Sequence, residues 1–263
     1  MWQSPVRSRG KSSLLFTKRL GSHTPANGPH SSPTRFFTSG KLHYPEAPSK
    51  DQHHDLASYM EYAERTGLDV KSMVFIGTHY EYSVASALRP LGFDLRRVGG
   101  HSDKGIDLLG TWSVPSTPAH LPIRAIIQCK AYSTAKTARI GPHFIRELEG
   151  AYLGAPPGWR GSGVIGLLVT QRPATKGVRE ALAKSRWPLG YVSCPGDGGF
   201  EQLLWNRRAE EEGLEGMGVA ASLSDDDRHG SAQRLVLTWK GRRCVAPKTT
   251  SPVEHDDAVS AAS

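Results

Sequence analysis

Residues 99–112, GGHSDKGIDLLGTW, and residues 123–130, IRAIIQCK, decide the fold because they read as two neighbouring strands. Side chains two positions apart on a strand point to the same face. In the second segment, Ala125, Ile127 and Cys129 therefore form an apolar face, while Gln128 and Lys130 project together from the other. The Pro- and Ser-containing residues 115–118 allow a turn, so we expect strands over 106–112 and 123–130 to lie side by side.

Two acids occupy positions that favour apolar residues. Asp107 lies within the apolar run 106–109, where an uncompensated carboxylate is unfavourable. Glu81 lies in a helix expected over Met73–Leu88, and the residues three, four and seven positions after it are apolar. Acids rarely occupy such positions without a partner. A hard divalent cation with oxygen ligands would supply one.

Phosphodiester hydrolysis uses groups of these types. A cation polarises the phosphoryl oxygen and activates water, and an ammonium steadies the attacking water or the developing negative charge. We expect Mg²⁺ or Mn²⁺ to be held by Asp107, the amide oxygen of Gln128 and the backbone carbonyl of Cys129. Glu81 would join them directly or through water, and Lys130 would supply the ammonium.

These residues resemble the restriction endonuclease-like PD-(D/E)xK superfamily, and within it the Mrr-like type IV restriction enzymes. The resemblance rests on the helix acid Glu81, on Gly105-Ile106-Asp107, and on Gln128-Cys129-Lys130 in place of the usual E-x-K. It continues through RELEGAYL, GVIGLLVT, PATKGVREALAKS and GYVSC, in the order of that family's core. More narrowly, residues 75–112 and the late VLTWKG look like a fungal mitochondrial group required for respiratory growth.

The resemblance implies an α/β fold with a restriction endonuclease-like core, in which helices flank a central mixed β-sheet over residues 72–241. It also implies a Mg²⁺-dependent DNA endonuclease that supports mitochondrial genome maintenance and respiratory growth; a homodimer is suggested by analogy alone. Glutamine carries no charge, so a metal at Gln128 would have fewer anionic ligands. The alternative is an inactive nuclease-fold protein that binds nucleic acid or a protein partner.

The net charge of +8 is concentrated at the start of the chain. Residues 1–42 hold seven Lys or Arg and no acid, a profile typical of a transit peptide to the mitochondrial matrix, and Arg35-Phe36-Phe37 resembles a processing site. A disordered basic tail is the alternative interpretation. Removing these seven charges leaves +1, so the whole-chain charge is poor support for DNA binding. The sequence contains no run of 18 apolar residues, so it predicts no membrane span.

Local charge is more informative near the predicted site, where a groove that attracts DNA phosphates is plausible. The expected nucleic-acid contacts are Arg97, His101, Lys104, Lys136 and Arg139. Alternatively, His101 only shapes a turn, and Lys136 and Arg139 belong to an ordinary solvated surface.

The remaining organisation is read from composition and periodicity. We expect a linker and short helix over 43–71, an acidic loop over 210–232, and a disordered tail over 242–263. We also expect a last helix near Phe200–Glu212, followed by a strand at Arg234–Trp239.

Overall fold

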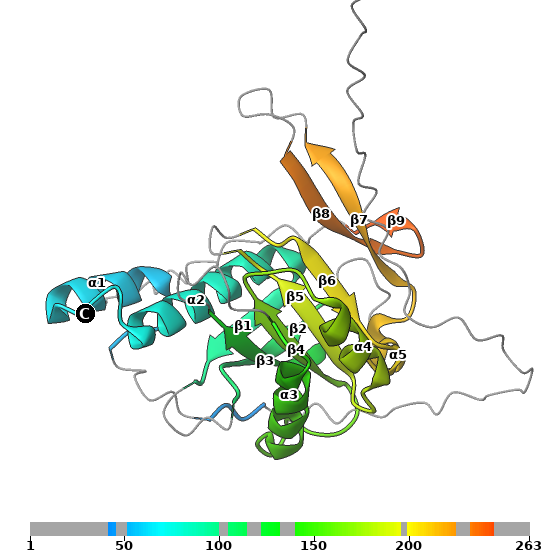
Figure 1. Ribbon diagram of the computed structural model, residues 1–263, viewed down its shortest axis with the longest axis horizontal. Helices are drawn as coiled ribbons and strands as arrows, with labels where there is room; N and C mark the ends of the chain where they lie inside the picture. Colours follow the sequence, from blue (N-terminus) through cyan, green and yellow to red (C-terminus); the bar gives the residue numbers. More distant parts are fainter. Residues whose placement is uncertain are drawn as a thin grey trace, which may run out of the picture.

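The structure, a computed structural model, describes residues 42–45, 52–99, 105–114, 122–131, 140–195, 199–224 and 232–244. It confirms the predicted α/β class, because a six-stranded mixed sheet is flanked by helices (Figure 1). The strands, in spatial as well as chain order, are β1 (Phe93–Arg97), β2 (Leu108–Trp112), β3 (Ile123–Lys130), β4 (Val164–Thr170), β5 (Leu189–Ser193) and β6 (Gln202–Trp205). β3, β4 and β5 run parallel, and every other neighbouring pair is antiparallel.

Helices cover both faces of this sheet. They are α1 (Leu56–Thr66), α2 (Met73–Leu88), which continues into the 3-10 turn η1 (Arg89–Leu91), α3 (His143–Gly154), α4 (Lys176–Lys184) and the short α5 (Arg207–Ala209). Ser72 begins α2 by accepting a hydrogen bond from the backbone N–H of Phe75, the usual role of an N-cap serine. α1 packs on α2 through the buried aromatic residues Tyr59, Phe75 and Tyr82.

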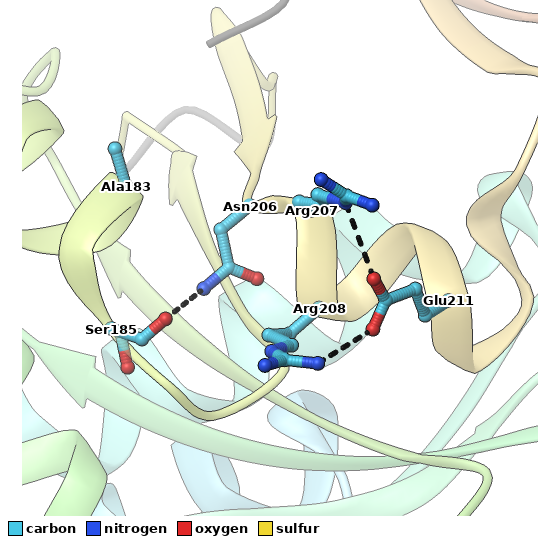
Figure 2. Close-up of a pocket in the computed structure, with 6 residues that line it drawn as sticks. All are labelled: Ala183, Ser185, Asn206, Arg207, Arg208 and Glu211. Carbon is cyan, nitrogen blue, oxygen red and sulfur yellow. Dashed lines mark hydrogen bonds and ion pairs between the residues drawn. The ribbon is translucent and has the colours of Figure 1, made fainter. Parts of the chain in front are cut away.

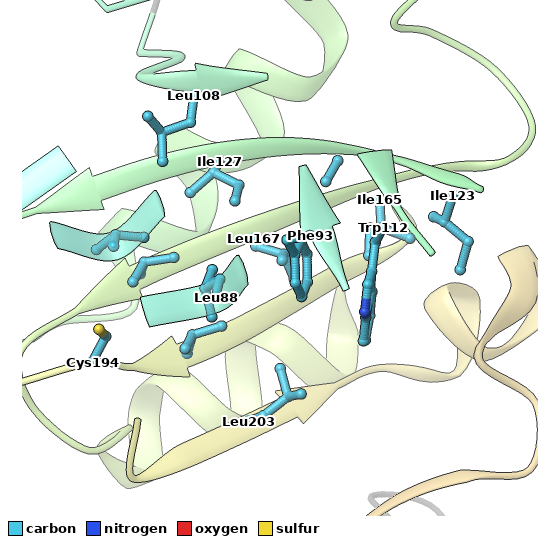
Figure 3. Close-up of a cluster of buried hydrophobic side chains, with 14 of the residues drawn as sticks. Leu88, Phe93, Leu108, Trp112, Ile123, Ile127, Ile165, Leu167, Cys194 and Leu203 are labelled. Atoms are coloured by element: carbon cyan, nitrogen blue, oxygen red, sulfur yellow. The ribbon is translucent and has the colours of Figure 1, made fainter. Parts of the chain in front are cut away.

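Two buried apolar layers show which helix lies on which face. On one face, the odd-numbered residues of β3 pack with Tyr80, Val84 and Leu88 of α2 (Figure 3). On the other face, Ile126 packs with residues of α3 and α4, among them Leu148. The alternation predicted for residues 123–130 is therefore confirmed. α2 lies on one face of the sheet, and α3 and α4 lie on the other.

A second sheet holds the C-terminal part of the described chain. It comprises β7 (Met217–Ser224), β8 (Ala232–Trp239) and β9 (Arg242–Arg243) (Figure 1). β8 pairs with both β7 and β9 and is therefore the central strand. Met217 and Leu237 are buried in the apolar layer that also contains α2, so the second sheet is attached to that face of the core. The strand expected at Arg234–Trp239 exists, but it belongs to this second sheet.

Three expectations for this part of the chain are corrected. Residues 202–205, near the start of the helix expected over Phe200–Glu212, form β6 because they pair with β5, and the helical part begins only at Arg207. The expected acidic loop 210–232 contains the π-helical turn η2 (Glu210–Leu214) and β7. Arg242–Arg243, expected in a disordered tail, pair with β8. Residues 1–41 and 245–263 lie outside the described residues.

Within the described ranges, no helix has both the length and the apolar character that crossing a bilayer requires.

Candidate functional site

Asp107 lies one residue before β2 rather than inside the strand expected at 106–112. Its backbone departs from the regular ladder: Leu108 is paired with Ile127, yet the Asp107 N–H also bonds to the Ile127 carbonyl, at 2.9 Å. The Asp107 carboxylate accepts the backbone N–H of Cys129 at 2.6 Å. One carboxylate oxygen of Asp107 therefore closes the end of the β2–β3 pairing.

Gln128 is buried, with only 3% of its surface exposed. Its amide nitrogen lies against Gly105, where an added Cβ would come within 2.9 Å of Nε2 and 3.7 Å of the Ala151 Cβ on α3. Gly105 has a φ of +78°, which favours glycine over any side chain. Among the described residues, nothing donates a hydrogen bond to the Gln128 Oε1 atom. Within the described part of the chain, the structure thus buries an amide oxygen that has no hydrogen-bond partner.

Lys130 also points towards α3. Its ammonium lies 3.0 Å from the Glu147 carboxylate and 5.3 Å from the centre of the Phe144 ring. The Lys130 and Glu147 side chains keep 29% and 45% of their surface exposed, so this ion pair is at the protein surface. Sequence reasoning did not anticipate Glu147. Its spacing of three residues from Phe144, which places the two on one side of the helix, is the signal that could have found it.

Glu81 approaches from the opposite face of the sheet because α2 carries it. Its carboxylate forms an ion pair with the Nε of Arg97 at 2.5 Å, and the two side chains are 13% and 12% exposed. The Arg97 guanidinium, which we expected to contact nucleic acid, is thus largely buried in an ion pair, and its contact with nucleic acid stays a prediction. Glu81 does have the partner that its position demands, but the observed partner is Arg97.

The four predicted residues surround the end of β3 from two sides. Burial raises the pKa of the Cys129 thiol, and the negative charges of Asp107 and Glu81 raise it further. Both carboxylates thus act on Cys129, while Gln128 and Lys130 reach towards α3.

Within the described part of the chain, no group of three or more His, Cys, Asp or Glu side chains is placed to hold a metal ion. His101, Lys104, Lys136 and Arg139 lie outside the described residues.

A separate cavity of about 350 Å³ lies at the end of α4 (Figure 2). It is lined by Ala183, Ser185, Asn206, Arg207, Arg208 and Glu211. Asn206 donates from its side-chain nitrogen to the carbonyls of Leu182 and Trp187, so it serves the local fold. None of the residues predicted to be catalytic lines this cavity.

Comparison with known proteins identifies the family. The family model described as "Required for respiratory growth protein 7" matches residues 72–122 and 116–223, which together make up more than half of the chain. The chain belongs to this family. Its matched region begins at the N-cap of α2, contains the whole six-stranded sheet and ends inside β7.

Two individual proteins are also similar. An uncharacterized mitochondrial protein of Schizosaccharomyces pombe is 31% identical over 160 residues, which are 60% of this chain and 61% of that protein. The chain therefore matches about three fifths of the length of this relative. The MspJI restriction endonuclease, in complex with a 27-mer oligonucleotide, is similar over 60% of this chain and 34% of that one, with 19% identity and a TM-score of 0.33. A score this low carries no argument about function.

Proposed function

We propose that this chain is a metal-dependent, Mrr-like nuclease of the mitochondrial matrix that hydrolyses phosphodiester bonds in DNA and so supports respiratory growth. The family's description supports a link to respiration, and the S. pombe relative is named as mitochondrial. The basic, acid-free residues 1–42 support import into the matrix. The proposal that the chain hydrolyses phosphodiester bonds rests on Asp107, Gln128 and Lys130, which lie at the end of β3.

The oxygen of Gln128, which has no hydrogen-bond partner among the described residues, carries the proposal. A buried polar atom without a hydrogen bond costs about 1–3 kcal/mol, so such atoms are rare unless something else binds them. Mg²⁺ prefers oxygen ligands and keeps several waters, so it needs few ligands from the protein. Gln128 Oε1, the Asp107 carboxylate and the Cys129 carbonyl would hold Mg²⁺ or Mn²⁺, and Glu81 would contribute through water. The donor types at this place therefore fit the ion.

Each residue has a distinct part in the proposed reaction. A bound divalent ion supplies polarisation of the phosphoryl oxygen and a lowered pKa for water. Asp107 brings negative charge to the site while its hydrogen bond to Cys129 fixes its orientation. Lys130, which Glu147 holds at the protein surface, is exposed enough to reach a phosphate and stabilise the charge that develops on it.

A second candidate is a nuclease fold that binds nucleic acid or a protein without cutting. One observation favours it: Glu81 and Lys130 are each engaged in an ion pair, with Arg97 and Glu147. Both candidates need the same core, so their difference lies in the chemistry of the site.

The test is cleavage of plasmid, linear duplex and single-stranded DNA by the full chain with Mg²⁺, Mn²⁺ or EDTA. Asp107→Asn keeps an oxygen for the Cys129 N–H and removes the charge, while Gln128→Leu removes the unpartnered oxygen at similar volume. We expect both variants to lose cleavage by about 100-fold or more. Lys176→Gln, at an exposed lysine on α4, is the matched control and should cut normally.

Metal binding gives a second readout. Thermal unfolding with and without Mn²⁺ should show stabilisation of the wild type and none for Gln128→Leu. A wild type that binds DNA but never cuts it, and is not stabilised by Mn²⁺, would establish the non-catalytic candidate instead.

A further inference from the structure

The turn between β8 and β9 gathers three cations. Lys240, Arg242 and Arg243 are all exposed. Among the described residues, none of the three forms an ion pair. The sequence from 228 to 253 contains no Asp or Glu. We call Trp239, Lys240, Gly241, Arg242 and Arg243 the basic tip. The basic tip lies within the part of the chain that the structure describes.

The strand register distributes these cations around the tip. Trp239 is paired with Arg242, and Thr238 with Arg243. Residues directly opposite each other share a face of the ribbon, and adjacent positions alternate between faces. Arg242 therefore lies on the face of Trp239, Arg243 lies on the other face, and Lys240 occupies the turn between them. The two faces and the end of one narrow β-ribbon each carry a positive charge.

The basic tip is anchored to the core. The Lys240 N–H bonds to the Gly216 carbonyl at 2.8 Å, and its ammonium lies 4.5 Å from the centre of the Trp239 ring. The Trp239 side chain packs against the apolar layer beneath the second sheet. Cations on an anchored ribbon lose less conformational freedom on binding than cations on a free tail, which favours a defined contact.

We propose that the basic tip binds duplex DNA by entering a groove, where the phosphates that border the groove meet the exposed cations Lys240, Arg242 and Arg243. The major groove of DNA admits a two-stranded β-ribbon. The partner class rests on the proposed function, but binding at the tip requires neither a metal nor cleavage.

The composition of the surface favours DNA over an anionic membrane. Electrostatic attachment to lipid uses clusters of about four to eight Lys or Arg, commonly helped by inserted apolar side chains. The basic tip has three cations, and within the described part of β7–β9 no large hydrophobic side chain is strongly exposed. The charge is thus modest for a lipid surface, while its placement on two faces suits a groove.

The basic tip lies far from the proposed reaction site. It is anchored at Gly216, and Gly213, three residues earlier, is close to Ile123 at the start of β3. Gln128 is five residues further along that strand, which corresponds to about 17 Å. Figure 1 shows β7–β9 on the side of the molecule away from α3. The tip therefore adds a second contact on DNA, separate from the residues at the end of β3.

The test compares two triple variants with the same change in charge. The first is Lys240→Asn, Arg242→Gln and Arg243→Gln; asparagine is chosen because residue 240 has a φ of +48°, which asparagine tolerates. The control is Lys176→Gln, Arg207→Gln and Arg208→Gln. Those cations are exposed too, but each is paired with Glu180 or Glu211 (Figure 2 shows the two arginines).

Binding to a fluorescent 20-base-pair duplex is measured in EDTA from 50 to 300 mM KCl, using the full chain. Three lost phosphate contacts should make the slope of log K against log salt shallower by about 2 to 3. We expect this change in the tip variant, with weaker binding at every salt concentration. The control variant should change the slope by less than about 1. Circular dichroism and urea unfolding confirm that both variants fold.

Several results would overturn the inference. A tip variant with the wild-type slope and affinity would exclude the tip as a DNA contact, as would an equal loss in the control. Equal effects on single-stranded DNA would contradict insertion into a groove. If the wild type ignores DNA but binds vesicles that contain anionic lipid, and the tip variant does not bind them, the tip would be assigned to membranes. Tip-dependent binding without cleavage would leave this inference standing while the proposed nuclease activity failed.

Discussion

Arg97→Met is expected to destabilise the folded chain by about 3 kcal/mol, because it leaves the Glu81 carboxylate buried without its partner. The pair joins the end of β1 to α2 across 2.5 Å, and each side chain is about seven-eighths buried. Arg97 also donates to the Thr78 hydroxyl at 3.4 Å. Removing the guanidinium thus takes away the charge partner and one polar contact together.

The magnitude follows from burial. Breaking a buried ion pair by removing one partner costs about 3–5 kcal/mol, and the remaining exposure of both side chains places this pair at the low end. Glu81→Leu should cost about 2 kcal/mol because it leaves the arginine unpaired, although a guanidinium reaches water more easily. The double variant removes both charges and should also cost about 2 kcal/mol, which gives a coupling free energy of about 3 kcal/mol.

The assay is urea unfolding at pH 7, followed by circular dichroism, on the wild type, both single variants and the double variant. Lys130→Met is the matched control, because it breaks an ion pair at the surface and should cost less than about 1 kcal/mol. A loss below 1 kcal/mol for Arg97→Met, or the absence of coupling to Glu81, would refute the reasoning.

Three further outcomes are expected from single positions. Gly105→Ala should destabilise by about 1–3 kcal/mol in urea unfolding, because its φ is +78° and the new Cβ meets the Gln128 amide at 2.9 Å. Gly110→Ala should abolish soluble folded protein on expression, since its Cβ would lie 1.9 Å from the Asp94 carbonyl oxygen, a backbone atom that cannot move aside cheaply. Burial raises the pKa of Tyr152 to about 12, so the unfolded chain loses this proton first and stability should fall as pH rises from about 10 to 12. Tyr152→Phe should remove that part of the fall in the urea midpoint, and an unchanged pH profile would contradict the assignment.

The elements with strong periodicity could be predicted from the sequence. Met73–Leu88 and Ile123–Lys130 have the predicted bounds, because each is a long, largely apolar segment with clear end signals. β6 could not be predicted in the same way. Its Leu203 and Leu204 face the two opposite apolar layers, so it shows no alternation, and only its pairing with β5 makes it a strand. β7 consists largely of small residues between acidic segments, which conceals its alternation.

The site could be predicted only in part for a related reason. Alternation along β3 places Gln128 and Lys130 on one face, as expected, because that rule is local. Which helix covers which face is a property of the whole fold. The sequence therefore contained no signal that α2 would bring Glu81 from the other face. The spacing of Glu147 from Phe144 places the two on one side of α3, but it does not say that this side meets Lys130. Local spacing also could not show that β1 would bring Arg97 to Glu81.

Two unfavourable features of the fold meet at one side chain, Gln128. Its oxygen is buried without a partner among the described residues, and its nitrogen packs against a glycine in a conformation that other residues avoid. A strand built for packing alone would carry an apolar residue at 128, as it does at Ile126 and Ile127, and would avoid a penalty of about 1–3 kcal/mol. Local conflicts of this kind concentrate where a protein binds something, because binding supplies the interaction that folding leaves unmade. Leucine at 128 should therefore strengthen the fold in the absence of a metal and abolish metal binding, whereas a purely structural glutamine would lose stability on the same substitution.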